Sequence, residues 1–213
     1  LSANPRRVLI LGGGDGLGLR EVLRWPSVTA VTLVDLDPAM TGLSESYPPL
    51  AALNRGAFSD PRVTVVNRDA FVWADDPCEP FDAAIVDFPD PSNYSVGKLY
   101  TTRFYRKLRQ KLAPGAGVSV QCTSPLFARN SYWCVVRTLE ASGFSGLPYH
   151  AAVPSFGVWG FALCRKEPFD IPRELPPGLR FLTPAMLPCL FDLPPDQGPV
   201  EVEVHRLDNQ LLL

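Results

Sequence analysis

Short apolar runs that end in turns divide the chain into regular elements. Val8–Leu11 is a β-branched and aliphatic run that stops at glycine, which predicts a buried strand. Apolar residues recur with helical spacing over residues 17–23 and 99–112, and Pro114-Gly115 predicts the end of the second helix. By the same signals we expect strands at 28–34, 62–66, 81–86, 117–122, 149–153 and 157–164 and a further helix at 129–141.

The alternation of these strands and helices predicts an α/β fold with a doubly wound, mostly parallel seven-stranded sheet. Only the last two strands are expected to form an antiparallel pair. From Glu167 onward the alternation gives way to proline-rich turns around short apolar pieces. We therefore expect one domain over residues 1–166 and an extension over residues 167–213 that packs on it.

The composition narrows the class of protein. The 213 residues are 46% hydrophobic, which predicts a folded core, and their net charge of −2 argues neither for nucleic acid nor for an anionic membrane surface as a partner, so we expect no nucleic acid partner. The sequence contains neither a signal peptide nor an apolar run long enough to span a membrane. It begins at Leu1 rather than Met, which is compatible with a piece of a longer protein. The five cysteines and two histidines are scattered and form no cluster of ligands, so we expect no metal site. An odd number of cysteines without a disulfide framework is typical of a reducing compartment.

A glycine-rich turn follows the first strand. Gly12, Gly13, Gly14 and Gly16 surround Asp15, and glycines allow a tight turn and a close approach of the backbone to a ligand. Their spacing matches neither the GxGxxG dinucleotide fingerprint nor the P-loop. The turn therefore indicates a nucleoside site, and the alternative is an ordinary structural turn of an α/β protein.

The next two strands also end in acidic residues. Asp35 is suited to accept both ribose hydroxyls of a nucleoside, as in nucleotide-binding α/β folds. The alternative is a helix N-cap, a role that we expect of Asp37 before Pro38. Asp69 and Ala70 follow the third strand, where an acid or a backbone amide can read an adenine edge. The alternative for Asp69 is a solvated loop acid.

The fourth strand ends in a pair of acids. Asp87 closes an apolar strand, and Asp90 follows in a turn that Pro89 and Pro91 stiffen. One carboxylate can accept a proton from an ammonium group while the other holds the rest of a cationic chain. A charge pair at ~4 Å contributes about 4 kcal/mol when the effective dielectric constant is about 20. We expect a cationic substrate here, with Tyr100 as a wall of its pocket; the alternative is a surface turn rich in Asp and Pro.

Five segments between Arg7 and Arg165 form a recognisable series of motifs. They are GGGDGLGLREVL at 12–23, VDLDP at 34–38, DPRVTVVNRDA at 60–70, FDAAIVDFPDP at 81–91 and LYTTRFYRKLRQKLAPGAGVSVQ at 99–121. On these segments the chain resembles the spermidine synthase (polyamine aminopropyltransferase) family. The resemblance implies a Rossmann-like, class I methyltransferase-like fold. It also implies transfer of an aminopropyl group from decarboxylated S-adenosylmethionine to putrescine or a similar polyamine, with release of methylthioadenosine and without a metal or another cofactor.

The resemblance assigns roles to individual residues. It implies that Asp15 meets the aminopropyl amine of the donor, that Asp35 holds the ribose and that residues 69–70 meet the adenine. Asp87 would take the proton from the attacking amine, and Asp90 would bind the rest of the acceptor. The reaction is then an in-line attack of nitrogen on a carbon activated by sulfonium sulfur, in which positioning and deprotonation supply the rate.

The chain also departs from the family. Phe88-Pro89 replaces the two serines that the family has between its paired acids, and the N-terminal β-hairpin that serves the substrate gate and oligomerisation is missing. The family's tyrosine-proline segment is replaced within VPSFGVWGF at 153–161. That segment and VEVEVHRLDNQ at 200–210 resemble a bacterial subgroup in which a membrane-spanning region precedes the domain. We therefore expect a cytoplasmic domain, with an inner-membrane protein and a homodimer both left open.

Two other functions stay open at this point. A methyltransferase that uses S-adenosylmethionine has the same fold, but it binds the methionine carboxylate and would not usually place an acid such as Asp15 against it. A binding or regulatory domain that holds a nucleoside or polyamine without turnover is the second alternative. The missing hairpin and the altered acceptor segment keep that alternative open.

Overall fold

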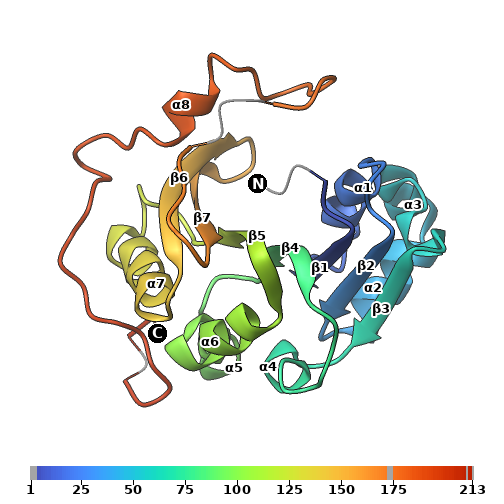
Figure 1. The fold of residues 1–213 in the computed structure, drawn as a ribbon, viewed down its shortest axis with the longest axis horizontal. Helices are drawn as coiled ribbons and strands as arrows, with labels where there is room; N and C mark the ends of the chain where they lie inside the picture. The colour runs from blue at the N-terminus through green and yellow to red at the C-terminus, as the bar shows by residue number, and fades with distance from the viewer. Residues whose placement is uncertain (1–3, 172–174, 210, 213) are drawn as a thin grey trace. The chain divides into compact units, whose positions relative to one another are not determined.

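The computed structural model describes residues 4–171, 175–209 and 211–212. Its seven strands form a sheet in the order β3-β2-β1-β4-β5-β7-β6 (Figure 1). β1 pairs in parallel with β2 and β4, and β2 pairs in parallel with β3, whereas β6 and β7 are antiparallel. The structure confirms the predicted α/β fold with a mostly parallel seven-stranded sheet and flanking helices.

The chain divides into two compact units. The first consists of the chain up to Pro89 together with Phe104–Val118, and the second of Asp90–Arg103 together with the chain from Ser119 onward. Two elements, α6 (Thr102–Gln110) and β5 (Leu112–Gln121), contribute to both units. The boundary expected at residue 166, between a domain and an extension, stays a prediction.

The first unit has an apolar core between its strands and helices. Val8 and Ile10 of β1, Val31 and Leu33 of β2 and Leu19 of α1 are all buried in one cluster. Burial of such side chains is the main favourable term in folding. The elements are β1 (Arg7–Gly12), α1 (Leu17–Leu23), β2 (Ala30–Asp35), α2 (Pro38–Ser46), α3 (Pro48–Asn54), η1 (Ala57–Ser59), β3 (Val63–Asn67), α4 (Ala70–Trp73) and β4 (Phe81–Asp87).

The register of the parallel strands brings their carboxyl ends to one edge of this unit. Gly12 at the end of β1 lies opposite Asp87 at the end of β4. Asp35 at the end of β2 lies opposite Asn67 at the end of β3. In open α/β sheets this edge is where ligands bind.

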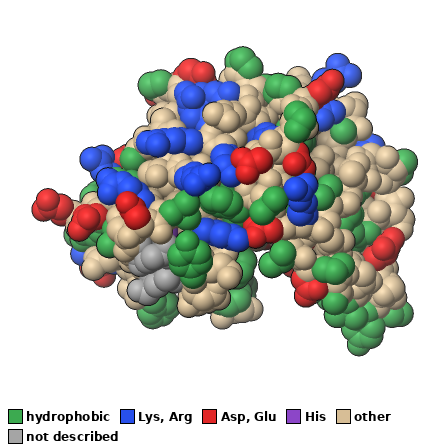
Figure 2. Space-filling model, turned by 90° about the horizontal axis from the view of Figure 1, so that it is seen from below, with side chains coloured by type: hydrophobic (Ala, Val, Ile, Leu, Met, Phe, Trp, Pro, Cys, Tyr) green, Lys and Arg blue, Asp and Glu red, His purple; other side chains and the backbone are tan. Residues whose placement is uncertain are grey.

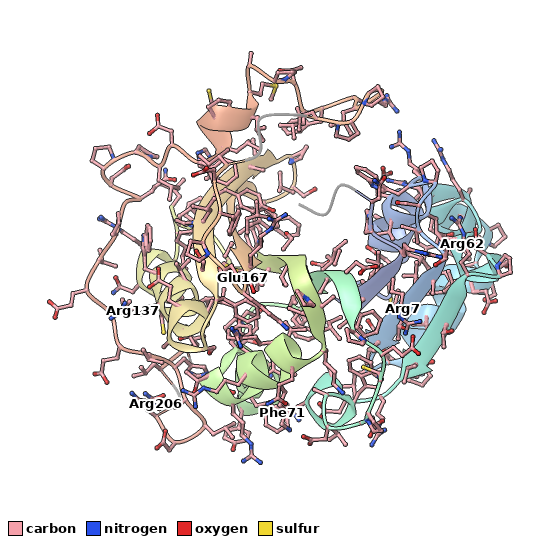
Figure 3. The ribbon with its side chains drawn as sticks, viewed as in Figure 1. Arg7, Arg62, Phe71, Arg137, Glu167 and Arg206 are labelled. Atoms are coloured by element: carbon pink, nitrogen blue, oxygen red, sulfur yellow. The ribbon has the colours of Figure 1, made fainter. Side chains whose placement is uncertain are left out.

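An arginine fixes the start of β3. Arg62, which is labelled in Figure 3, lies just before β3. It donates to Asp60 Oδ2 at 2.8 Å and to the carbonyl oxygens of Leu23 and Val28. The hydrogen bonds from Arg62 lower the pKa of Asp60 to about 2. The arginine therefore ties β3 to the end of α1 and to the chain that enters β2.

The second unit contains α5 (Tyr94–Gly97), η2 (Lys98–Tyr100), α7 (Arg129–Ala141), β6 (Ser145–Val153), β7 (Gly157–Arg165) and α8 (Leu187–Leu190). α7 lies beside β6 (Figure 1). It also holds the proline-rich extension, because Trp133 Nε1 donates to the Gln197 carbonyl at 2.9 Å and Arg129 Nε to the Gly198 carbonyl at 2.8 Å. Within this unit the extension is therefore hydrogen-bonded to a long helix.

Most element limits agree with the prediction, and the differences have physical causes. α1 and α7 have the predicted limits. β5 begins at Leu112 and runs through Pro114-Gly115, which the sequence indicated only as a helix stop. β6 begins at Ser145 rather than residue 149 and includes Pro148. β6 is the last strand in the sheet order, and an edge strand tolerates a proline because one side of it needs no hydrogen-bonded partner.

The surface is mixed in charge on the face that Figure 2 draws, where Lys and Arg side chains lie next to Asp and Glu. Ion pairs of the first unit include Lys107 with Asp75, at 2.7 Å, and Arg68 with Asp76. Lys107 also lies 4.2 Å from the centre of the Phe71 ring. This mixture agrees with the small net charge of the chain.

Within the part of the chain that the structure describes, no helix is both long and apolar enough to cross a membrane. Among the same residues, no three His, Cys, Asp or Glu side chains are grouped so that they could hold a metal ion. The cysteines are free thiols, of which Cys122, Cys134 and Cys164 are buried.

Candidate functional site

The loop that joins β1 to α1 depends on glycine. Gly12, Gly13 and Gly16 have φ angles of 79°, 64° and 77°, a region that side-chain-bearing residues rarely adopt. A Cβ atom on Gly16 would lie 2.5 Å from the Phe58 ring. The loop backbone can therefore pass close to its neighbours, and residues 12–17 bring no lysine or arginine to it.

Asp35 holds this loop in place. Its Oδ2 accepts a hydrogen bond from the Gly14 amide at 3.0 Å, and its Oδ1 accepts one from the Asp37 amide at 2.9 Å. A Cβ atom on Gly14 would lie 2.6 Å from Oδ2. Each carboxylate oxygen has two acceptor positions, so Asp35 retains acceptor capacity. Asp37 is the N-cap of α2, as predicted, because its Oδ1 accepts from the Ala39 amide at 2.8 Å.

Asp15 lies between the glycine loop and α1. Its Oδ1 accepts a hydrogen bond from the Leu17 amide at 2.9 Å, and its carbonyl accepts one from Asn54 Nδ2 at 3.2 Å. The side chain is therefore oriented by the first turn of the helix, where a negative charge is favourable. Asn54 is itself fully buried, which anchors Asp15 to the end of α3.

Asp87, the last residue of β4, is an acid whose pKa is raised. It ends β4 opposite Gly12 and remains accessible to solvent, while the following Phe88 is buried against Phe104. Partial removal of its carboxyl group from water raises the pKa of Asp87, and the negative charge of Asp15 raises it further. The two carboxylates therefore interact, as expected if both face one ligand. A raised pKa makes Asp87 a stronger proton acceptor than an ordinary aspartate.

Asp69 and Ala70 lie at the start of α4, two and three residues beyond the end of β3. Asp69 is the N-cap of this helix, because its Oδ1 accepts a hydrogen bond from the Phe71 amide at 2.9 Å. Ala70 is buried. The structure thus shows a local structural role for Asp69, and contact with an adenine stays a prediction for both residues.

Asp90 belongs to the second unit and has a hydrogen-bond network of its own. Its Oδ1 accepts from Gln121 Nε2 and its Oδ2 from Thr123 Oγ1, both at 2.9 Å. Gln121 Oε1 in turn accepts from the Tyr100 hydroxyl at 3.0 Å. Tyr100 is 1% exposed and orients Gln121, and its role as a wall of the substrate pocket stays a prediction.

Gln121 and Thr123 are not among the site residues that the sequence predicts. The available signal was their place at the carboxyl end of β5, directly after a buried apolar run that includes Val118 and Val120. Polar residues that follow a buried parallel strand face the edge where ligands bind. The same reasoning that selected Asp35 and Asp87 therefore applies to them.

The chain is similar to known proteins in sequence and in fold. The model of the spermine/spermidine synthase domain matches residues 1–173. The chain is 47% identical over 209 residues to a polyamine aminopropyltransferase of Leptospira interrogans serogroup Icterohaemorrhagiae, an alignment that covers 98% of the chain and 42% of that protein. It is 52% identical over 210 residues to polyamine aminopropyltransferase 2 of Ralstonia nicotianae, covering 98% of the chain and 41% of the relative. The chain thus spans about two fifths of the length of these relatives.

Two solved structures share the fold. A spermidine synthase in complex with the transition-state analogue AdoDATO aligns with a TM-score of 0.79 at 27% identity, over 91% of this chain and 68% of that one. The spermidine synthase of Thermotoga maritima aligns with a TM-score of 0.78 at 26% identity, over 91% of this chain and 67% of that one.

Proposed function

Because the chain belongs to the spermine/spermidine synthase family, we propose that it transfers an aminopropyl group from decarboxylated S-adenosylmethionine to a polyamine acceptor such as putrescine. Methylthioadenosine is the second product. The observation that carries the proposal is the pair Asp15 and Asp87, two interacting carboxylates beside a glycine loop that contains no cation. The names of the relatives support the same reaction.

The donor is held by the ends of β1, β2 and β3. The glycine loop, Gly12 to Gly14, gives close backbone access, and Asp35 has free acceptor capacity for the ribose hydroxyls. Asp69 and Ala70 contact the adenine in this proposal. Asp15 faces the ammonium group of the aminopropyl chain, and no basic residue of the loop competes with it.

Asp87 removes the proton that the acceptor amine must lose. The nitrogen lone pair attacks the carbon next to the sulfonium sulfur, the carbon–sulfur bond breaks, and its electron pair stays on sulfur as the neutral thioether. The nitrogen releases its proton to Asp87, and the raised pKa of Asp87 makes its carboxylate a suitable proton acceptor. Asp90 binds the rest of the acceptor, so that the attacking nitrogen is held in line with the carbon.

Release of methylthioadenosine tests the proposal. The chain is incubated with decarboxylated S-adenosylmethionine and a panel of diamines and polyamines, and the nucleoside product is quantified by chromatography. We expect product with at least one amine and none without an amine. Product formation from S-adenosylmethionine by methyl transfer, or no product with any amine, would overturn the proposal.

Several finer expectations from the sequence stay predictions. They are the homodimer, the cytoplasmic location, the inner-membrane protein with a membrane-spanning region, and the exclusion of nucleic acid as a partner. The panel of amines described above would identify the preferred acceptor.

A further inference from the structure

Thr123 has a backbone conformation that its residue type disfavours. Its φ angle is 68°, and apart from glycines the only other positive φ angle among the described residues belongs to Arg55. A β-branched residue in this region is a genuine outlier, because its branched Cβ crowds the backbone. Such conformations persist only where the surrounding structure enforces them, and they concentrate at functional sites.

A close backbone contact enforces this conformation. The Thr123 carbonyl accepts a hydrogen bond from the Gly160 amide at 2.7 Å, and the Gly160 carbonyl accepts one from the Cys122 amide at 2.9 Å. A Cβ atom on Gly160 would lie 2.4 Å from the Tyr132 ring and 2.7 Å from the Thr123 carbonyl oxygen. β7 can therefore approach residue 123 only because residue 160 is a glycine.

The strained backbone conformation brings the Thr123 hydroxyl into hydrogen-bond contact with the Asp90 carboxylate. Thr123 Oγ1 donates to Asp90 Oδ2 at 2.9 Å, while Gln121 Nε2 donates to Oδ1 at the same distance. Both donors are neutral, so they orient the carboxylate without cancelling its charge. Among the described residues Asp90 forms no ion pair with Lys, Arg or His. Its negative charge is therefore fixed in direction and available to an external cation.

The Thr123 hydroxyl can also serve that cation directly. Its hydrogen points to Asp90, so its oxygen lone pairs are left to accept from other donors. A primary ammonium group carries three N–H donors and matches a cluster of acceptors better than a substituted amine does. The carboxylate of Asp90 and the oxygen of Thr123 supply such a cluster.

We propose that Thr123 is a positioning residue that sets the affinity for the primary ammonium end of the acceptor, by holding Asp90 in one orientation from a strained backbone. The inference rests on the proposed function, in which Asp90 binds the acceptor. The free-energy cost of the strained backbone is thereby offset, because the Asp90 carboxylate is already oriented when the ligand binds.

A pair of substitutions separates the hydroxyl from the backbone. Thr123→Ser keeps the hydroxyl and Thr123→Ala removes it, and both relieve the crowding of a branched Cβ at positive φ. We expect Thr123→Ala to raise the KM for the amine by about 10-fold or more, the scale of a hydrogen bond to a charged group, with kcat and the KM for the donor unchanged. Thr123→Ser should stay within about 3-fold of the unaltered chain.

Stability measurements exclude a merely structural effect. Thr123→Ser should not lower the melting temperature, because it keeps the hydroxyl and removes the branched Cβ from a crowded conformation. Thr123→Ala gains the same relief but loses the hydrogen bond to Asp90, so its melting temperature should fall less than that of a threonine whose hydroxyl is lost without any relief of strain. Thr138→Ala is the control, since the Thr138 hydroxyl is buried and donates to the Cys134 carbonyl. It should lower the melting temperature and leave the KM for the amine unchanged.

The outcomes distinguish failure of this inference from failure of the proposed function. Two results would show that the positioning role is wrong when the unaltered chain is active. In the first, Thr123→Ala changes the KM for the amine by less than about 2-fold. In the second, Thr123→Ser raises the KM for the amine as much as Thr123→Ala does. If the unaltered chain releases no methylthioadenosine, the proposed reaction is wrong. Calorimetric titration of putrescine into the methylthioadenosine complex then decides the inference: weaker binding by Thr123→Ala supports it, and equal or absent binding overturns it.

Discussion

A Cβ atom on Gly12 would stand 2.2 Å from the carbonyl oxygen of Asp87, so β1 and β4 meet at the site through a position that only glycine can occupy. The φ angle of Gly12, 79°, adds a second penalty for any side chain. We expect Gly12→Ala to destabilise the folded chain by more than the ~1–2 kcal/mol of the φ angle alone and to abolish most turnover. Thermal denaturation and methylthioadenosine release measure the two effects.

Gly42→Ala is the matched control. Gly42 lies inside α2, its added Cβ would meet no atom within 4 Å, and its φ angle is not positive. This substitution should stabilise the chain by about 0.5–1 kcal/mol through helix propensity and leave turnover unchanged. Equal effects of the two substitutions would show that the contact between Gly12 and Asp87 has no special role.

The acid at the end of β4 should be needed for chemistry and not for donor binding. Asp87→Asn keeps the shape of the side chain but cannot accept the proton of the attacking amine. We expect the transfer rate to fall by ~10²–10⁴, while the affinity for methylthioadenosine measured by calorimetry stays nearly constant. Asp37→Asn is the control, because Asp37 caps α2 and asparagine is an equally good N-cap. Unimpaired turnover by Asp87→Asn would remove Asp87 from the mechanism.

The limits of sequence-based prediction are visible in α2 and α3. These helices bury polar residues, with Thr41, Ser44 and Asn54 at most 5% exposed, and they expose Leu43 and Leu53 by half or more. A search for an apolar helical face finds no signal when the polar residues face inward. Only Asp37 and Pro38, at the N-cap and the first turn of α2, marked a helix start there.

The site shows the same contrast. Asp15, Asp35 and Asp87 were predictable because they follow apolar parallel strands, whose carboxyl ends meet at one edge. The interaction of Thr123 with Asp90 was not, because it depends on a positive φ angle that the sequence of a threonine does not indicate. A close approach of another strand decides that angle, and sequence patterns carry no information on it.

The buried histidine of the second unit makes stability depend on pH. His205 is 0% exposed, its Nε2 lies 3.0 Å from the Gly97 carbonyl, and its Nδ1 has no hydrogen-bond partner among the described residues. The carbonyl requires Nε2 to carry a proton, and the buried Nδ1 has no acceptor for a second one, so burial favours the neutral ring in the folded chain. Burial lowers the pKa of His205, so the unfolded chain binds a proton first as the pH falls.

The folded chain should therefore lose stability as the pH falls below about 6.5, the ordinary value for histidine, until the lowered pKa is reached. His205→Gln cannot be protonated in this range and should flatten the dependence of melting temperature on pH between 5 and 7. The same substitution at His150, on β6, provides the comparison. If the pH dependence of His205→Gln equals that of the unaltered chain, His205 does not carry the acid-linked loss.

Asp15 should decide which donor the chain accepts. Decarboxylated S-adenosylmethionine presents only an ammonium group at the end of its aminopropyl chain, whereas S-adenosylmethionine adds a carboxylate on the same carbon. The side chain of Asp15 is oriented by the Leu17 amide, and its charge already acts on Asp87. It should attract the first donor and repel the second, because like charges in contact cost several kcal/mol where the dielectric constant is reduced.

We therefore expect a clear preference for the decarboxylated donor, and a weaker preference in Asp15→Asn, which retains the hydrogen bond to Leu17. Calorimetry of both donors on both proteins measures the difference, and equal or tighter binding of S-adenosylmethionine by the unaltered chain would favour a methyltransferase instead.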